Sequence, residues 1–195
     1  HHIECYGLVD RDYLDEDQLS AYKEKGIFAP RVSEVENLLL VSNVVQAVAD
    51  QLLLNPNDVL EQIKQYVFDV FEREIPAHSL ESTRYKVALL MGQFSSGQSD
   101  VGGYVADLSD FTARLDAQAI HDSVEAVART IWASRDYDGV LRIFNRKAMV
   151  KSVDRFFNIR GSAYVDKVIE MATRGKGNIR EHMMEFLPDI EACLP

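Results

Sequence analysis

The fold of this chain is decided by a short apolar run that ends in two aspartates, IECYGLVDRDY at residues 3–13, and by a second short run, IFAP at 27–30. The first run has little polar alternation, which is typical of a buried and often parallel strand. The polar segment 15–25 between the runs predicts a helix, and Gly26 is suited to end it. Strand, helix and strand within 30 residues predict a small βαβ unit.

The remainder of the sequence predicts mostly helices. Residues 1–54 are expected to hold the first part of an α/β core, 55–138 a helical insertion, and 139–195 a returning strand with C-terminal helices. Within the insertion, Pro76 is expected to separate two helices, and the stretch 95–103 (SSGQSDVGG) to form a mobile loop. The run Val140–Phe144 is rich in apolar side chains, so we expect it to join the sheet. The predicted fold class is therefore α/β, with a small, mainly parallel sheet and a large helical part.

Composition narrows the classes of function. The net charge is −10, but it divides into −13 over residues 1–138 and +3 over 139–195. Such an acidic chain is a poor general binder of nucleic acid, although its basic C-terminal part leaves a local basic face open. No apolar run reaches the roughly 18 residues that cross a membrane, so no membrane partner is expected. With only Cys5 and Cys193, a reducing cytoplasm is the simpler location.

The chain begins with His1 and His2, which we interpret as a tag remnant, and then enters an apolar run directly. We expect that an upstream strand belongs to the same sheet and is missing from this sequence.

Asp10 and Asp12 follow the first predicted strand, at the place where ligands gather in open α/β sheets. Two aspartates one residue apart can bind one hard cation through their oxygens. The alternative is a polar loop that uses aspartate only because it forms turns. Glu34 and Glu36 follow the second strand, and parallel strands would bring them to the same edge. Carboxylates packed that closely need a cation or protons, although glutamates in a first helical turn also suit the helix dipole.

The pattern of an apolar strand, Asp-Arg-Asp, a helix, a short strand and then Glu-Val-Glu-Asn-Leu (34–38) resembles the Toprim domain. More narrowly, it is similar to the Toprim-like domains of bacterial proteins fused to ABC-type ATPases, which are related to the overcoming-lysogenization-defect nucleases. The resemblance covers residues 3–40 and, more weakly, 140–157. Residues 55–135 match no family pattern that we can name.

This resemblance implies a site. Asp10 and Asp12 take the positions of the pair that binds Mg²⁺ (or Mn²⁺), and Glu36 is the best match for the next acidic ligand, with Glu34 second. Lys147 is carried over weakly as a catalytic lysine, because relatives show Gly-Lys where this chain has Asn145-Arg146-Lys147. The family also has a glutamate after an earlier strand, and we expect that strand to be missing from this sequence. We therefore expect weak or absent catalysis by this chain alone.

A basic stretch follows the predicted returning strand. If the protein handles nucleic acid, the helix after Phe144 should turn Lys147, and Lys151 one turn later, toward the acidic edge. The alternative is a solvated helix face. The nucleic-acid-binding candidates in this stretch are Arg146, Lys147, Lys151 and Arg155.

Two functions of different classes remain open. The first is a Mg²⁺-dependent DNA nuclease or nicking module linked to an upstream ATPase domain, and by family analogy directed at phage DNA. The second is a catalytically silent interaction domain for assembly, with a homo-oligomer as one option. A phosphate-handling receiver or phosphatase fold is a weaker third, because the later Thr/Ser and Lys that it needs cannot both be placed.

Overall fold

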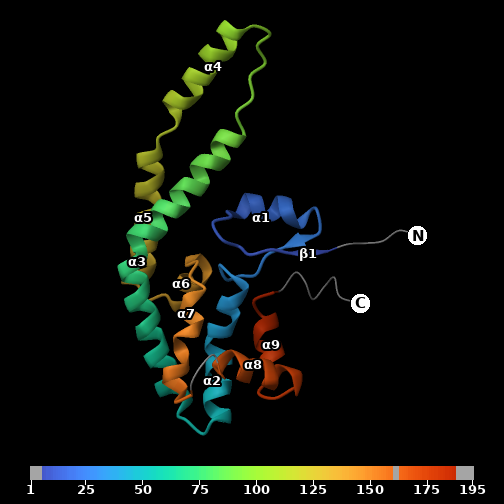
Figure 1. The fold of residues 1–195 in the computed structure, drawn as a ribbon, viewed down its shortest axis with the longest axis vertical. Helices are drawn as coiled ribbons and strands as arrows, with labels where there is room; N and C mark the ends of the chain where they lie inside the picture. Colours follow the sequence, from blue (N-terminus) through green and yellow to red (C-terminus); the bar gives the residue numbers. More distant parts are fainter. Residues whose placement is uncertain (1–5, 160–162, 188–195) are drawn as a thin grey trace, which may run out of the picture.

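The computed structural model describes residues 6–159 and 163–187, and Figure 1 shows their arrangement. The elements in chain order are β1 (Gly7–Leu8), α1 (Glu16–Lys23), β2 (Ile27–Phe28), the 3-10 helix η1 (Val35–Leu40), α2 (Ser42–Gln51), α3 (Pro56–Gly92), α4 (Val101–Arg114), α5 (Ala117–Ala133), α6 (Tyr137–Ile143), α7 (Ala148–Lys151), the 3-10 helix η2 (Val153–Phe157), α8 (Ala163–Thr173) and α9 (Ile179–Met184). The two N-terminal histidines, Cys5 and Cys193 lie outside the described residues.

The expected βαβ unit is present. β1 and β2 pair in parallel, with Gly7 opposite Ile27 and Leu8 opposite Phe28, and α1 connects them. Asp15 caps α1 in a reciprocal capping box with Gln18, as its position before the polar helix favours. Within the described residues this is a two-stranded sheet in a mostly helical protein. The structure is thus α/β with a large helical part.

One hydrophobic core runs from Val32 to Ile179 and holds the rest of the protein together. α2 packs against the first half of α3, while α6, α7 and η2 fill the space between them (Figure 1). Helices α8 and α9 cover α2 from the other side. The segment 55–138 contributes to this core through α3 and the end of α5, since Ile63, Phe71 and Ala128 are completely buried.

The predicted break at Pro76 is wrong, because α3 runs through it from Pro56 to Gly92. Pro76 lies on the exposed side of the helix, and so does Glu72, whose carbonyl loses its usual intrahelical partner to the proline. Water can bind that carbonyl. Meanwhile Ile75 and Ser79 are buried on the opposite side. Packing of that face outweighs the local cost of the proline.

The predicted strand at Val140–Phe144 is also wrong, since Tyr137–Ile143 forms helix α6. The side chain of Asp136 caps the helix by accepting a hydrogen bond of 2.9 Å from the backbone N–H of Gly139. The buried residues recur at helical spacing, as Tyr137, Val140, Leu141 and Phe144. This periodicity is present in the sequence, but it becomes visible only when Tyr137 is counted with the apolar run.

Beyond Thr83 the long helices leave the core and form a distal arm, which we define as residues 84–123 (Figure 1). α4 carries no buried residue, and the ring of Phe94 contacts Tyr104 and Phe111 at centroid distances of 5.8 Å and 5.1 Å. α4 begins at Val101, inside the stretch expected to be a mobile loop, because Asp100 caps it. Among the described residues no helix is both long and apolar enough to cross a membrane.

The amide of Asn37 generates the first testable prediction. This side chain is fully buried, and its Nδ2 donates to the carbonyls of Leu141 and Phe144, each at 3.0 Å. It therefore fixes η1 to the end of α6. We expect Asn37→Ala to lower the free energy of unfolding by about 2–4 kcal/mol, because the buried carbonyls of Leu141 and Phe144 each lose this donor, although that of Leu141 keeps the N–H of Ser33, and a cavity remains. Urea denaturation monitored by circular dichroism measures this change.

Asn57→Ala is the matched control, because Asn57 is exposed and its side chain accepts a hydrogen bond from Gln46 on the surface. It should change stability by less than about 0.5 kcal/mol. An Asn37→Ala protein as stable as the control would show that the contact between η1 and α6 does not depend on this amide.

Candidate functional site

The two loops that follow β1 and β2 are joined by hydrogen bonds at one edge of the sheet. The backbone N–H of Asp12 donates to the carbonyl of Ser33 at 2.9 Å, and the N–H of Val35 donates to Asp10 Oδ1 at 3.0 Å. Asp12 has a φ of +42°, a conformation that aspartate tolerates better than most residues. The loops are thus locked together, with both pairs of acidic residues in the same region.

Lys147 lies among three of these carboxylates. Its Nζ is 3.7 Å from Asp10 Oδ2, 3.9 Å from Glu34 Oε1 and 3.7 Å from Glu36 Oε1. The oxygens of Asp10 and Glu36 can therefore be no farther apart than twice 3.7 Å. The sequence predicts Asp10, Asp12 and Glu36, with Glu34 as the second match, at one edge of the sheet and Lys147 turned toward it. Asp10, Glu34 and Glu36 do lie around Lys147. We call Asp10, Asp12, Glu34 and Glu36 the carboxylate cluster.

Asp12 belongs to the carboxylate cluster but makes no ion pair with Lys147. Its Oδ1 accepts a 2.7 Å hydrogen bond from Nδ2 of Asn145, and no ion pair within 4 Å joins it to Lys147. Burial, followed by the nearby charge of Asp10, raises the pKa of the Asp12 carboxyl. In the sequence, Asn145 is visible only as a departure from the Gly-Lys pattern of the family. Nothing in that pattern indicates its hydrogen bond with Asp12.

Glu34 is the most constrained member of the carboxylate cluster. It is 1 % exposed, and its Oε2 has no hydrogen-bond partner among the described residues. Burial raises the pKa of Glu34 to about 7; the ammonium of Lys147 opposes this shift, whereas Glu36, Asp10 and Asp12 add to it. A buried carboxylate oxygen without a donor calls for either a proton or a cation.

The ammonium reaches the cluster from the loop after α6. Phe144 ends that helix in an extended conformation, and Lys147 is the residue before α7. The charges of Glu34, Glu36 and Asp10 raise the pKa of Lys147, so the side chain is a cation at neutral pH. Its side chain remains 59 % exposed, and solvent or a ligand can approach it.

The other basic candidates lie elsewhere. Arg146 pairs with Glu74 of α3 at 2.8 Å, and the guanidinium of Arg155 lies 4.6 Å from the ring centroid of Tyr66. Lys151 is exposed and makes no ion pair with the carboxylate cluster in the described part of the chain. Only Lys147 of this group faces the acidic edge.

His78 belongs to an aromatic group that includes Tyr13, the residue after Asp12. The ring of His78 lies 5.8 Å from that of Tyr13 and 6.1 Å from that of Phe144. Burial lowers the pKa of His78 to about 4, so the imidazole is neutral at pH 7. His78 thus packs as an uncharged ring.

The oxygen ligands of the carboxylate cluster are of the kind that binds a hard divalent cation. Their positions in this structure do not form a coordination shell. All four acidic side chains offer oxygen, the ligand that Mg²⁺ and Mn²⁺ prefer, and Glu34 has a carboxylate oxygen that nothing else satisfies. Across the described residues no group of three or more His, Cys, Asp or Glu side chains is already arranged around one ion position. The charge of Lys147 occupies the centre where these oxygens would converge.

Comparisons with protein-family models, with curated proteins and with solved structures find no match to this chain.

The burial of Glu34 generates a pH-dependent prediction. Its folded-state pKa of about 7 lies above its ordinary value of 4.5, so the folded chain binds the proton more tightly than the unfolded chain. Stability from this group is fully present below pH 4.5 and is lost as the pH rises through 7. Glu34→Gln, which is neutral at every pH, should therefore be more stable than wild type by up to about 3 kcal/mol at pH 8 in EDTA. The two proteins should converge toward pH 4.

Urea denaturation at several pH values measures this difference, from which the shared contribution of His78 cancels. Glu72→Gln is the control, because Glu72 is exposed on α3. It should follow wild type within about 0.5 kcal/mol throughout. A Glu34→Gln protein that is less stable than wild type at pH 8, or offset equally at all pH values, would contradict the assignment of a costly buried charge.

Proposed function

We propose that this protein is a Mg²⁺- or Mn²⁺-dependent phosphodiesterase acting on DNA, as its resemblance to Toprim-like nucleases implies. The observation that carries the proposal is the convergence of Asp10, Glu34 and Glu36 on Lys147. Four carboxylates at the carboxyl edge of a parallel sheet, with one partly exposed lysine among them, supply both a cation-binding set and a phosphate-binding group.

In this proposal, different side chains bind the cation and the phosphate. Asp10, Glu36 and Asp12 would bind the cation, with the buried Glu34 as a further ligand. A cation bound there supplies Lewis-acid stabilisation of the phosphate and a more acidic water. Once a bound cation had displaced it from the carboxylates, the ammonium of Lys147 would bind a phosphate oxygen and stabilise the negative charge that develops during cleavage. Asn145 would hold the Asp12 carboxylate in place through its 2.7 Å hydrogen bond.

The resemblance over residues 3–40 supports this proposal, whereas the later segment gives it no support. The family pattern expects a strand before the lysine, whereas this chain has helix α6. Lys147 nevertheless lies beside the carboxylates, because the loop after α6 carries it to the same edge. The proposed role of Lys147 therefore depends on its contacts in this structure and no longer on a matching strand.

Lys147 also suggests a second function. An ammonium placed among three carboxylates offsets part of their negative charge without any metal, as a silent assembly domain would need. The distal arm favours this alternative, since Val101, Tyr104 and Val105 of α4 expose 78 %, 47 % and 54 % of their surfaces. Apolar side chains in that position suit contact with another protein. DNA and an ATPase domain are the partners expected for the phosphodiesterase, and a second copy of this chain is the partner expected for the assembly domain.

Thermal unfolding with added cation separates these functions. At pH 8 and low ionic strength, Mg²⁺ or Mn²⁺ should raise the Tm of the wild-type chain, with about 2.7 kcal/mol of stabilisation at one hundred times its Kd. Asp10→Asn combined with Glu36→Gln should abolish that shift. Asp17→Asn, on the exposed first turn of α1, should keep it.

Nicking of supercoiled plasmid DNA provides the catalytic readout on the same proteins. We expect slow cation-dependent nicking by the wild-type chain, loss of nicking in the double variant and retention in Asp17→Asn. If cations leave the Tm unchanged and no nicking occurs, the phosphodiesterase proposal is contradicted and the assembly function is favoured.

A further inference from the structure

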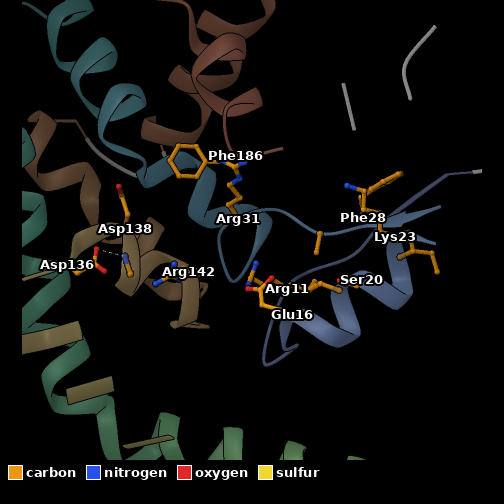
Figure 2. A pocket seen from close by; sticks show the side chains of 14 residues that line it. Arg11, Glu16, Ser20, Lys23, Phe28, Arg31, Asp136, Asp138, Arg142 and Phe186 are labelled. Carbon is orange, nitrogen blue, oxygen red and sulfur yellow. Dashed lines mark hydrogen bonds and ion pairs between the residues drawn. The ribbon is translucent and has the colours of Figure 1, made fainter. Parts of the chain in front are cut away.

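A cavity of about 580 Å³ is lined by residues of α1, β2 and α6, together with Arg11, Arg31 and Phe186 from the segments that follow β1, β2 and α9 (Figure 2). Its volume falls in the range of sites that hold a nucleotide-sized ligand. None of the four acidic residues of the carboxylate cluster lines it. The cavity is therefore a separate feature that the proposed phosphodiesterase chemistry does not use.

Three arginines from three different segments line this cavity. Arg11 comes from the loop after β1, Arg31 from the segment after β2, and Arg142 from α6, and Figure 2 shows them around the same space. Segments that are far apart in the sequence have thus brought three guanidinium groups to one concave surface. Like charges gathered in this way repel one another unless anions compensate them.

The carboxylates of the cavity compensate these cations only in part. Glu16 pairs with Arg11 at 2.5 Å, and this pair holds Arg11 in a position where its side chain is only 14 % exposed. Asp136 uses its Oδ1 to cap α6. Within residues 6–159 and 163–187, no ion pair within 4 Å joins Arg31 or Arg142 to a carboxylate. Two guanidinium groups facing the cavity are therefore available to an anion.

The cavity also offers surfaces suited to the uncharged part of a nucleotide. Phe28, Leu19 and Phe186 contribute to its lining. The backbone N–H of Arg31 donates to the carbonyl of Phe186 at 2.8 Å, so an aromatic ring is held beside this guanidinium (Figure 2). An arginine binds phosphate through two parallel N–H groups, and an aromatic ring can stack on a base.

We propose that this cavity binds a nucleotide through its phosphate group, with Arg31 and Arg142 as the phosphate ligands and Arg11 as a fixed neighbouring cation. The phosphate could belong to a free nucleotide or to the terminus of a nucleic-acid strand. The site does not depend on a metal ion, and it stands whether or not the carboxylate cluster cleaves DNA. A second cavity of about 190 Å³ shares Arg11 and Arg142 and is also lined by Asp12, which places the two sites on neighbouring surfaces.

Isothermal titration calorimetry of the whole chain in EDTA tests this proposal without involving the carboxylate chemistry. The probes are AMP, adenosine and a short 5′-phosphorylated single-stranded DNA compared with its unphosphorylated form. Arg31→Gln with Arg142→Gln should weaken binding of the phosphorylated probe at least about tenfold. Asp138→Asn should strengthen it, because that change removes a negative charge from the cavity lining.

Arg114→Gln on the distal arm is the matched control and should bind as wild type does. Circular dichroism confirms that each variant is folded. Binding of AMP identifies a free nucleotide as the ligand, and binding of the phosphorylated DNA alone identifies a strand terminus. The proposal is overturned if adenosine binds as tightly as AMP, if the arginine variants bind as wild type does, or if no phosphorylated probe binds.

Discussion

The site depends on one electrostatic interaction, the placement of the Lys147 ammonium among Asp10, Glu34 and Glu36. Without a cation at that point, three carboxylates held at one edge of the sheet would repel one another, and the buried Glu34 would lose the ammonium that faces its Oε1. The rest of the local structure maintains this arrangement. Solvent weakens the attraction between Lys147 and these carboxylates, since the lysine side chain is 59 % exposed.

The backbone fixes both halves of the interaction to each other. Ser33 donates its N–H to the carbonyl of Leu141 at 2.8 Å, and Asn37 donates to that carbonyl and to that of Phe144. The loop that carries the glutamates is therefore attached to the end of α6, from which the loop bearing Lys147 departs. Residues more than one hundred positions apart are held in register by buried hydrogen bonds, which are strong because no water competes for them.

The sequence predicted the βαβ unit and the acidic edge because their signals are local. An apolar run that ends in Asp10, and Gly26 after a polar segment, report on the few residues around them. The sequence did not predict helix α6, whose evidence lies in the spacing of Tyr137, Val140, Leu141 and Phe144 rather than in the apolar run alone. Nor did it predict the passage of α3 through Pro76, because tertiary packing on both sides of the proline decides that outcome.

For the candidate site, the sequence indicated which residues take part, but it did not indicate which side chains contact one another. Asp10, Glu34 and Glu36 were identified from their places after the two strands and Lys147 from the family resemblance, and these four lie together. The contact of Asn145 with Asp12 and the pairing of Arg146 with Glu74 depend on side-chain directions that no sequence spacing encodes. The arginine cavity has the same origin, since Arg31 and Arg142 are brought to one cavity by the tertiary fold and not by their spacing in the sequence.

The central claim is that Lys147 holds the position that a divalent cation would take among the carboxylates. Calorimetric titration of Mn²⁺ into Lys147→Gln at pH 8, compared with wild type and with Lys151→Gln, tests it most directly. Removal of the competing ammonium should tighten Mn²⁺ binding about tenfold or more, which corresponds to about 1.4 kcal/mol, whereas Lys151→Gln should match wild type. Equal or weaker Mn²⁺ binding by Lys147→Gln would show that the lysine and the metal do not compete for this cluster.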